Sequence, residues 1–198
     1  MRISFKKQQF EAREDAILDA VNSLLAKKGF DLMTMDDVAA EVGIAKGSLY
    51  KHFSSKESLA AAALCRMTRD TLDLLTEMAP DMAAIDKLKG TLRWALQRRL
   101  KGAVPHLPST SVALQRSLML NLTYMRLIMK LNAELRRLVI AAQNEGVLDR
   151  TLPCEVILYT IYARSCDPTL EYLRTSGRYD DAQTVDYLVR TCFDGLNG

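Results

Sequence analysis

The stretch from Met33 to Glu57 constrains this chain most, because it predicts two short helices joined by a tight turn. Thr34 is a favourable N-cap for the first helix, and Asp37, three residues later, completes a capping box. Gly43 is the residue type that ends a helix in the left-handed conformation. A second short helix follows at residues 46–52. Helix, glycine turn and short helix together indicate a helix-turn-helix, whose second helix can enter the major groove of DNA.

The helices on either side of this stretch are also predicted from local signals. Ser54 precedes Glu57 by three positions, which is a second capping-box pattern and predicts the start of the next helix. Its apolar period continues to about Met78. The helix that precedes the stretch is expected to end at Gly29, with Phe30 packing back against it.

The second short helix carries more hydrogen-bond donors than its own stability needs. Leu49 and Phe53 are four residues apart and can be buried on one face. Gly47 exposes the backbone near the helix start, where N–H groups can meet a phosphate. The remaining side chains then face a duplex. The candidate DNA-binding residues are Thr34, Ala45, Lys46, Gly47, Ser48, Tyr50, Lys51, His52 and Lys56.

The segment GIAKGSLYKHFSSKESL, residues 43–59, resembles the signature of the TetR family of one-component transcriptional regulators. The resemblance implies an all-α protein. A three-helix helix-turn-helix domain would occupy residues 1–54, and a larger helical domain for ligand binding and dimerisation would occupy residues 55–198. Ala45 departs from the pattern, because many relatives have a serine there that caps the helix and touches phosphate. We expect one fewer backbone contact at that position.

The candidate residues divide into two roles. Contacts to phosphate fix the register of a protein on the duplex, whereas contacts to base edges read the sequence. The expected phosphate contacts are Thr34, Tyr50, His52 and Lys56. The expected base contacts are Lys46, Ser48 and Lys51, with a possible methyl contact from Ala45.

The N-terminus, residues 1–9, contains Arg2, Lys6 and Lys7 and no acidic residue. It could be a frayed, solvated terminus or a basic arm that reaches the minor groove. The whole chain has a formal net charge of only +3, which neither demands nor excludes a nucleic-acid partner.

Helical periodicity continues through the rest of the chain, with no strand alternation. The segment 111–145 is long for one globular helix and predicts two helices with a break. The segment 153–174 should be interrupted at Asp167 and Pro168, because proline lacks a backbone donor. A last helix is expected at 180–196.

The resemblance implies that the last two long helices, at about 152–174 and 180–196, pair with those of a second copy. They contain more apolar surface than one core-facing stripe needs, which is typical of an interface. A dimer is also expected because one short recognition helix supplies too little affinity for an operator. The candidate interface residues are Ile157, Ile161, Leu170, Leu173, Val185, Leu188, Val189 and Cys192.

The resemblance also implies a ligand pocket inside the C-terminal domain. Soft and amphipathic side chains of the kind that line adaptable pockets occur there, although the same residues could simply fill a core. Arg126 could meet an anionic ligand or point into solvent. The candidate pocket residues are Trp94, Met119, Tyr124, Met125, Arg126, Met129, Tyr159 and Tyr162.

Other chemistry finds little support in the sequence. The four cysteines show no CxxC spacing and the two histidines have no helical partner, so neither a metal site nor a cofactor is expected. No nucleophile–base set or carboxylate pair suggests an enzyme. No apolar run is long enough for a membrane span, and no signal peptide is recognisable, so a cytoplasmic protein is expected.

These observations favour a homodimeric DNA-binding regulator, a repressor that a small apolar or amphipathic ligand releases. Its partners would be a pseudo-palindromic DNA operator, a second copy and the effector. Two recognition helices would then lie in successive major grooves, roughly 34–36 Å apart. An activator or a ligand-independent regulator is the alternative, and a helical adaptor for proteins is a remote one.

Overall fold

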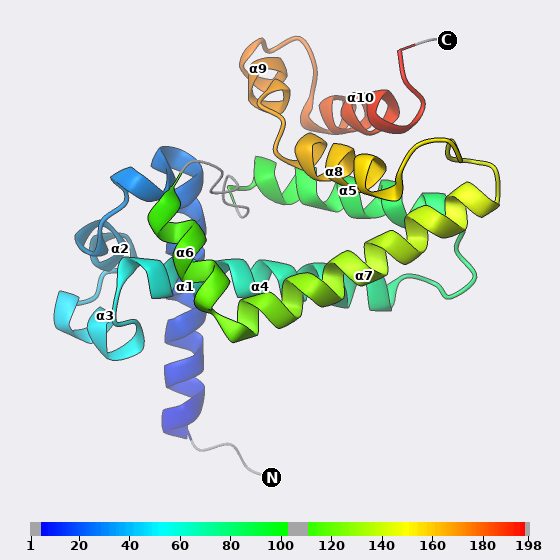
Figure 1. The fold of residues 1–198 in the computed structure, drawn as a ribbon. Helices are drawn as coiled ribbons and strands as arrows, with labels where there is room; N and C mark the ends of the chain where they lie inside the picture. The colour runs from blue at the N-terminus through cyan, green and yellow to red at the C-terminus, as the bar shows by residue number, and fades with distance from the viewer. Residues whose placement is uncertain (1–4, 103–110, 197–198) are drawn as a thin grey trace. The chain divides into compact units, whose positions relative to one another are not determined.

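In the computed structural model, which describes residues 5–102 and 111–196, every regular element is an α-helix (Figure 1). The helices are α1 (Phe5–Leu32), α2 (Met35–Val42), α3 (Lys46–His52), α4 (Lys56–Glu77), α5 (Ala84–Leu100), α6 (Val112–Leu120), α7 (Leu122–Asn144), α8 (Cys154–Ser165), α9 (Thr169–Thr175) and α10 (Asp181–Phe193). This confirms the all-α class. Among the described residues, no helix has the length and apolarity that a membrane crossing requires.

The chain divides into two compact units. Unit 1 comprises Met1–Met67 and Gly102–Arg126, and unit 2 comprises Thr68–Lys101 and Leu127–Gly198. Helices α4 and α7 have residues in both units. The functional division after residue 54 stays a prediction, and the compact unit around the helix-turn-helix extends beyond it.

The end of α1 follows from its glycine. Gly29 has φ 73° and ψ 173°, which breaks the helical backbone three residues before the element ends. Phe30 then turns back into the core of unit 1, where only 8% of its surface is exposed. The predicted stop at Gly29 is therefore confirmed.

The start and end of α2 have the predicted local chemistry. The Asp37 backbone N–H donates to the Thr34 hydroxyl over 3.1 Å, and the Thr34 backbone N–H donates to the Asp37 carboxylate over 2.8 Å. This reciprocal pair is a capping box. At the other end Gly43 has φ 74°, in the left-handed region that side chains other than glycine disfavour.

The predicted cap of α4 is wrong by one residue. Ser55, and not Ser54, accepts a hydrogen bond from the backbone N–H three residues on, at Ser58. The Ser58 hydroxyl in turn accepts from the Ser55 backbone N–H, again over 3.1 Å. Two serines therefore satisfy each other's backbone donors, and Glu57 is not needed for the cap.

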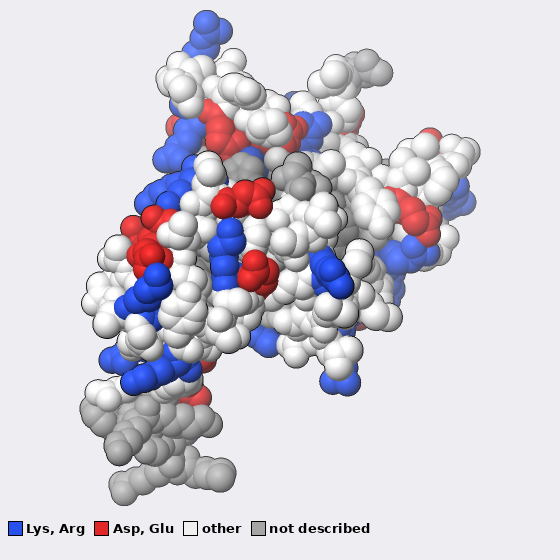
Figure 2. All heavy atoms as spheres, turned by 60° about the vertical axis from the view of Figure 1, so that its left-hand side comes forward, with Lys and Arg blue, Asp and Glu red and all other residues white. Residues whose placement is uncertain are grey.

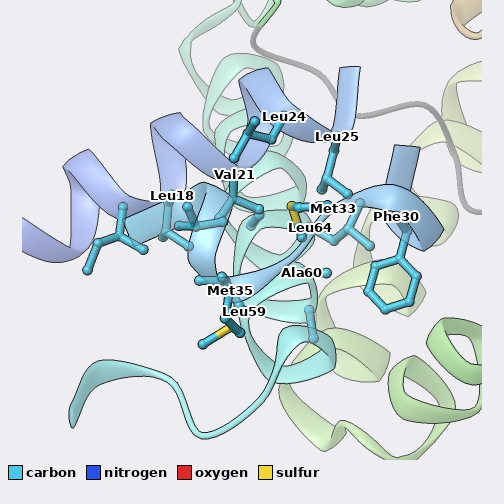
Figure 3. Close-up of a cluster of buried hydrophobic side chains, with 14 of the residues drawn as sticks. Leu18, Val21, Leu24, Leu25, Phe30, Met33, Met35, Leu59, Ala60 and Leu64 are labelled. Atoms are coloured by element: carbon cyan, nitrogen blue, oxygen red, sulfur yellow. The ribbon is translucent and has the colours of Figure 1, made fainter. Parts of the chain in front are cut away.

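Apolar side chains from α1, the α1–α2 connection and α4 form the core of unit 1 (Figure 3). Val21 and Met33 are fully buried there, together with Leu59 at the start of α4. Leu114 and Leu118 place α6 against the same cluster. This core fixes the position of α2 and α3, because both short helices are too short to be stable alone.

Unit 2 is built around α5, which packs against α8 and α10. Arg99 of α5 is buried, with 3% of its side chain exposed, and bonds across the break between α8 and α9. Its guanidinium donates to the carbonyl oxygens of Ser165 and Asp167 and to the carboxylate of Glu171. The break at Asp167 and Pro168 was predicted, and so was the break between α6 and α7, which falls at Asn121.

Candidate nucleic-acid interface

Helix α3 is held to unit 1 by one apolar side and leaves the other side open. Leu49 is fully buried in the core of unit 1, and Ile44 and Phe53 pack against that core from either end. The opposite surface is exposed at Lys46, Gly47, Tyr50 and Lys51, with Ala45 exposed at the N-cap position and Ser48 partly exposed. The helix therefore presents a mainly polar surface of the size that a major groove accepts.

The two lysines of this surface, Lys46 and Lys51, differ in whether they already form an ion pair within the protein. The Lys46 ammonium lies 2.8 Å from a carboxylate oxygen of Asp36 on α2. This hydrogen bond raises the pKa of Lys46. In contrast, the described contacts assign no acidic partner to Lys51, which is exposed at the end of the same helix. Lys51 is consequently the cation on α3 with the least competition for a DNA partner.

The N-terminal cap of α2 includes a second ion pair, in which Asp37 is held by Lys28 and Thr34. The Asp37 carboxylate lies 2.6 Å from the Lys28 ammonium and accepts the Thr34 hydroxyl hydrogen over 2.6 Å. Hydrogen bonds from Lys28 and then from Thr34 lower the pKa of Asp37 from 3.8 to about 2. The exposed Thr34 hydroxyl is thus oriented by its own cap, and a phosphate contact from it stays a prediction.

His52 does not face the exposed side, which corrects the expectation of a phosphate contact. Its imidazole ring stacks on the phenyl ring of Phe10 in α1, with ring centroids 4.1 Å apart. Its Nδ1 lies 3.5 Å from a carboxylate oxygen of Glu14, and only 3% of its side chain is exposed. His52 therefore fastens the end of α3 to α1.

Lys56 is partly exposed and already has partners at the end of α1, so a phosphate contact from it stays a prediction. Its ammonium donates to the carbonyl oxygens of Phe30 and Asp31 over 3.0 Å and 3.3 Å. It also lies 4.3 Å from the centroid of the Phe30 ring, in a cation–π contact. Lys56 thus contributes a donor to two carbonyl groups at the end of α1, one of which, that of Phe30, also accepts the Met33 backbone N–H.

The surface on the side of α2 and α3 alternates in sign rather than forming one basic face (Figure 2). The pairs of Lys46 with Asp36 and of Lys28 with Asp37 belong to this pattern, and Lys27 lies 3.6 Å from Glu41. The sequence identified Lys46 as a candidate contact but not its acidic partner Asp36.

The N-terminal basic segment is only partly described. Helix α1 begins at Phe5, so Lys6 and Lys7 belong to its first turns, and Arg2 lies outside the described residues. A role for residues 1–9 in the minor groove stays a prediction.

The structure does not bring the eight predicted pocket residues together within one unit. Four of them belong to unit 1 and four to unit 2. Met119, Met129 and Tyr159 are each about two-thirds exposed, at 71%, 65% and 66%. The members of unit 1 are Met119, Tyr124, Met125 and Arg126, and those of unit 2 are Trp94, Met129, Tyr159 and Tyr162.

The better-buried members of that set have contacts of their own. Tyr124 packs against the core of unit 1, and burial raises the pKa of its phenol. The Tyr162 hydroxyl donates to the side-chain oxygen of Asn132 over 2.7 Å. The Trp94 ring lies 4.9 Å from the Arg98 guanidinium carbon. Core and surface packing account for these three residues without a ligand.

Two cavities of unit 2 are lined by described residues, and none of the eight residues lines either of these two. The first, of about 280 Å³, lies between α4, α5 and α7. The second, of about 230 Å³, lies between the α7–α8 connection, α8 and the end of α10. Within the described residues, no group of three or more His, Cys, Asp or Glu side chains is placed to hold a metal ion.

The predicted interface residues are mostly core residues, which corrects that assignment. Six of the eight have at most 9% of their surface exposed, because α8, α9 and α10 bury them within unit 2, while Leu173 and Cys192 are partly exposed. A partner cannot reach side chains that are covered in this way. The buried six are Ile157, Ile161, Leu170, Val185, Leu188 and Val189.

Other apolar residues of the same helices are exposed instead. Leu152, Val156 and Tyr159, at and just before α8, are 44%, 50% and 66% exposed. Leu152 and Val156 also line the second cavity, together with Phe193 of α10. The helical period of the sequence predicted which residues of α8 are apolar, but it did not predict which of them the rest of unit 2 leaves exposed to solvent.

The geometry described so far defines a helix-turn-helix protein with a second helical unit. Residues 17–63 match a family described as bacterial regulatory proteins, tetR family. The biofilm operon icaADBC HTH-type negative transcriptional regulator IcaR of Staphylococcus aureus is 48% identical over 46 residues, 23% of this chain and 25% of that protein. The match therefore spans about a quarter of the length of this curated relative.

Solved structures extend the likeness to the whole fold. A transcriptional regulator of the TetR/AcrR family from Thermobifida fusca has a TM-score of 0.60 at 19% identity and covers 94% of this chain and 100% of its own. FadR from Bacillus subtilis, solved in complex with stearoyl-CoA, has a TM-score of 0.65 at 14% identity and covers 92% and 99%. The family match thus covers the helix-turn-helix at residues 17–63, and the solved structures show a likeness of the fold.

Proposed function

We propose that this protein is a homodimeric, sequence-specific DNA-binding regulator that represses transcription until a small ligand releases it. The observation that carries the DNA-binding part is the surface of α3. Leu49 anchors the helix, while Tyr50 and Lys51 stay exposed on its other side. A short helix that is fixed on one side and polar on the other fits a recognition helix in the major groove.

The corrected contacts refine the roles on that surface. Tyr50 and the Gly47 backbone would contact phosphate, and Lys51, Ser48 and Lys46 would read base edges. His52 and Lys56 would act indirectly, because they hold α3 and the start of α4 against α1. Repression is the proposed direction of control because the relative IcaR is a negative regulator.

A dimer is proposed because two linked recognition helices are needed for operator-grade affinity. The exposed apolar residues Leu152, Val156 and Tyr159 are the proposed interface in place of the buried set. Burial of this surface in a second copy would remove it from water, which favours association.

Control by a ligand is proposed for unit 2. The neighbour FadR was solved with stearoyl-CoA, so this fold can bind a small molecule. Helix α4 has residues in both units, and a ligand that favours one position of α4 would couple the two sites. Such a regulator would work in the cytoplasm, where bacterial DNA lies.

Selection of bound duplexes from a random library, at two salt concentrations, tests the proposal. We expect recovery of a pseudo-palindrome whose half-sites are about 10–10.5 base pairs apart, or a multiple of that spacing. Recovery of no preferred sequence, with binding that disappears as salt rises, would show electrostatic attraction alone and would contradict the proposal.

A further inference from the structure

The cavity of about 280 Å³ between α4, α5 and α7 combines an apolar floor with a cationic rim. Leu72 of α4 and Leu138 of α7 form the buried part of the lining, with Leu75 partly exposed beside them. The charged lining residues are Lys87 of α5 and Lys130, Glu134 and Arg137 of α7, which together leave a net charge of +2.

Three of the four charged residues are regularly spaced on one helix, α7. Lys130, Glu134 and Arg137 are four and three residues apart, so they lie on one side of α7. Arg137 donates to the Glu134 carboxylate over 3.1 Å, which neutralises the one acid of the lining. The Lys87 ammonium bonds only to the Pro80 carbonyl oxygen among its described partners, at 3.2 Å. The described contacts assign no acid to Lys130, which is exposed.

A chemical preference follows from this arrangement. Two lysines whose charges are not neutralised favour an anion, and an ammonium donates charge-assisted hydrogen bonds to a carboxylate or similar group. The leucine lining favours an apolar portion attached to that anion, because Leu75 is partly exposed and burial of apolar surface is favourable. A volume of about 280 Å³ is at the small end for ligand pockets, so the apolar portion should be short.

We propose that this cavity binds a small organic anion, a carboxylate carried on a short apolar body, and that this anion is the effector. The role as effector rests on the proposed function, whereas binding itself does not. Lys130 and Lys87 would hold the carboxylate, and Leu72, Leu75 and Leu138 would contact the apolar body.

Isothermal titration of the free full-length protein tests binding without DNA. The probes are octanoate and 2-naphthoate, each compared with its neutral amide. We expect saturable binding of at least one carboxylate, about tenfold or more tighter than its amide, which is the scale of a hydrogen bond to a charged group. Equal binding of acid and amide, or no binding of either carboxylate, would overturn the proposal.

Three variants locate the site. Lys130→Gln should weaken the carboxylate about tenfold and leave its amide unchanged. Thr76→Trp, at an exposed residue of the same lining, should weaken both by filling the cavity. Lys101→Gln is the matched control, because it removes one exposed charge of unit 2 outside the lining. A loss in Lys101→Gln equal to that in Lys130→Gln would show unspecific attraction and contradict the site.

Separate DNA titrations distinguish the two proposals. A protein that binds duplex DNA but no carboxylate refutes the anion site alone. A protein that binds the carboxylate but no DNA refutes the proposed regulator alone. If both bind, release of the selected duplex by the carboxylate in wild type, and not in Lys130→Gln, establishes the effector role. Duplex affinity that the carboxylate leaves unchanged would refute that role.

Discussion

The imidazole ring of His52 stacks on the phenyl ring of Phe10, with centroids 4.1 Å apart and an angle of 26° between the ring planes. The end of the proposed recognition helix is thereby tied to a residue far toward the N-terminus. His52 is a buried packing residue in this arrangement, although its place on α3 suggests a DNA contact.

Replacement of His52 distinguishes packing from phosphate contact. We expect His52→Ala to lower the free energy of unfolding by about 0.5–1.5 kcal/mol from the lost ring pair, and to weaken DNA binding as a consequence. His52→Phe keeps a ring on Phe10 and should retain both properties. Thermal unfolding and DNA titration measure this. If both variants lost DNA affinity equally and unfolded like the wild type, His52 would be a phosphate contact and not a packing residue.

Lys51 and Lys56 form a charge-matched pair with opposite expected effects. Lys51→Gln should reduce DNA affinity and lower the slope of log affinity against log salt by about 1, with little change in stability. Lys56→Gln should instead destabilise the fold, because the carbonyl oxygens of Phe30 and Asp31 lose the charged ammonium that donates to them. Salt-dependent titration and urea unfolding separate the two effects. A salt slope lowered by Lys56→Gln alone would reverse the assignment.

The low pKa of Asp37 predicts an acid-sensitive contribution to stability. Because hydrogen bonds from Lys28 and Thr34 lower this pKa from 3.8 to about 2, ionised Asp37 stabilises the folded state above pH 4. That contribution should be lost as the pH falls from about 4 through 2. Asp37→Asn should be less stable than wild type at pH 7 and should lose less between pH 4 and 2. Urea unfolding across this range checks the difference, and parallel curves for the two proteins would contradict it.

The exposed apolar surface of α8 predicts where a dimer can be broken. Val156→Glu should convert the proposed dimer to monomer, because a charge would be buried in the interface without a partner. Met82→Glu places the same charge at another exposed apolar residue, 39% exposed against 50% for Val156, and should leave the dimer intact. Sedimentation velocity measures the mass. A dimer that persists in Val156→Glu would exclude this surface.

Local chemistry made much of the fold predictable. Thr34 and Gly43 mark the start and the end of α2, and the groups that each of them contacts lie only a few residues away. Both ends of the helix could therefore be predicted from the local sequence. The break at Pro168 was likewise predictable from proline geometry. The length of the segment 111–145 predicted a break within it, but not its position at Asn121. The displaced cap at Ser55 shows the limit of this reasoning, because Ser54 matches the capping-box pattern with Glu57, but the adjacent Ser55 forms the cap with Ser58.

The candidate site was less predictable wherever the partner is distant in sequence. Nothing near His52 or Lys56 indicates Phe10 or the Phe30 carbonyl oxygen, and only the folded chain brings them together. The same limit applies to α8. Helical period marks Ile157 and Ile161 as apolar, but it does not say that unit 2 itself covers them and leaves Val156 exposed.

The central claim is that the exposed surface of α3 binds DNA, and Tyr50, 46% exposed on a helix anchored by Leu49, tests it most directly. The measurement is a fluorescence anisotropy titration of the selected duplex, and of an unrelated duplex, with wild type and Tyr50→Ala. We expect about tenfold or more loss of affinity for both duplexes, the size of one lost hydrogen bond to a charged phosphate, with an unchanged unfolding midpoint. Wild-type affinity in Tyr50→Ala would contradict the account.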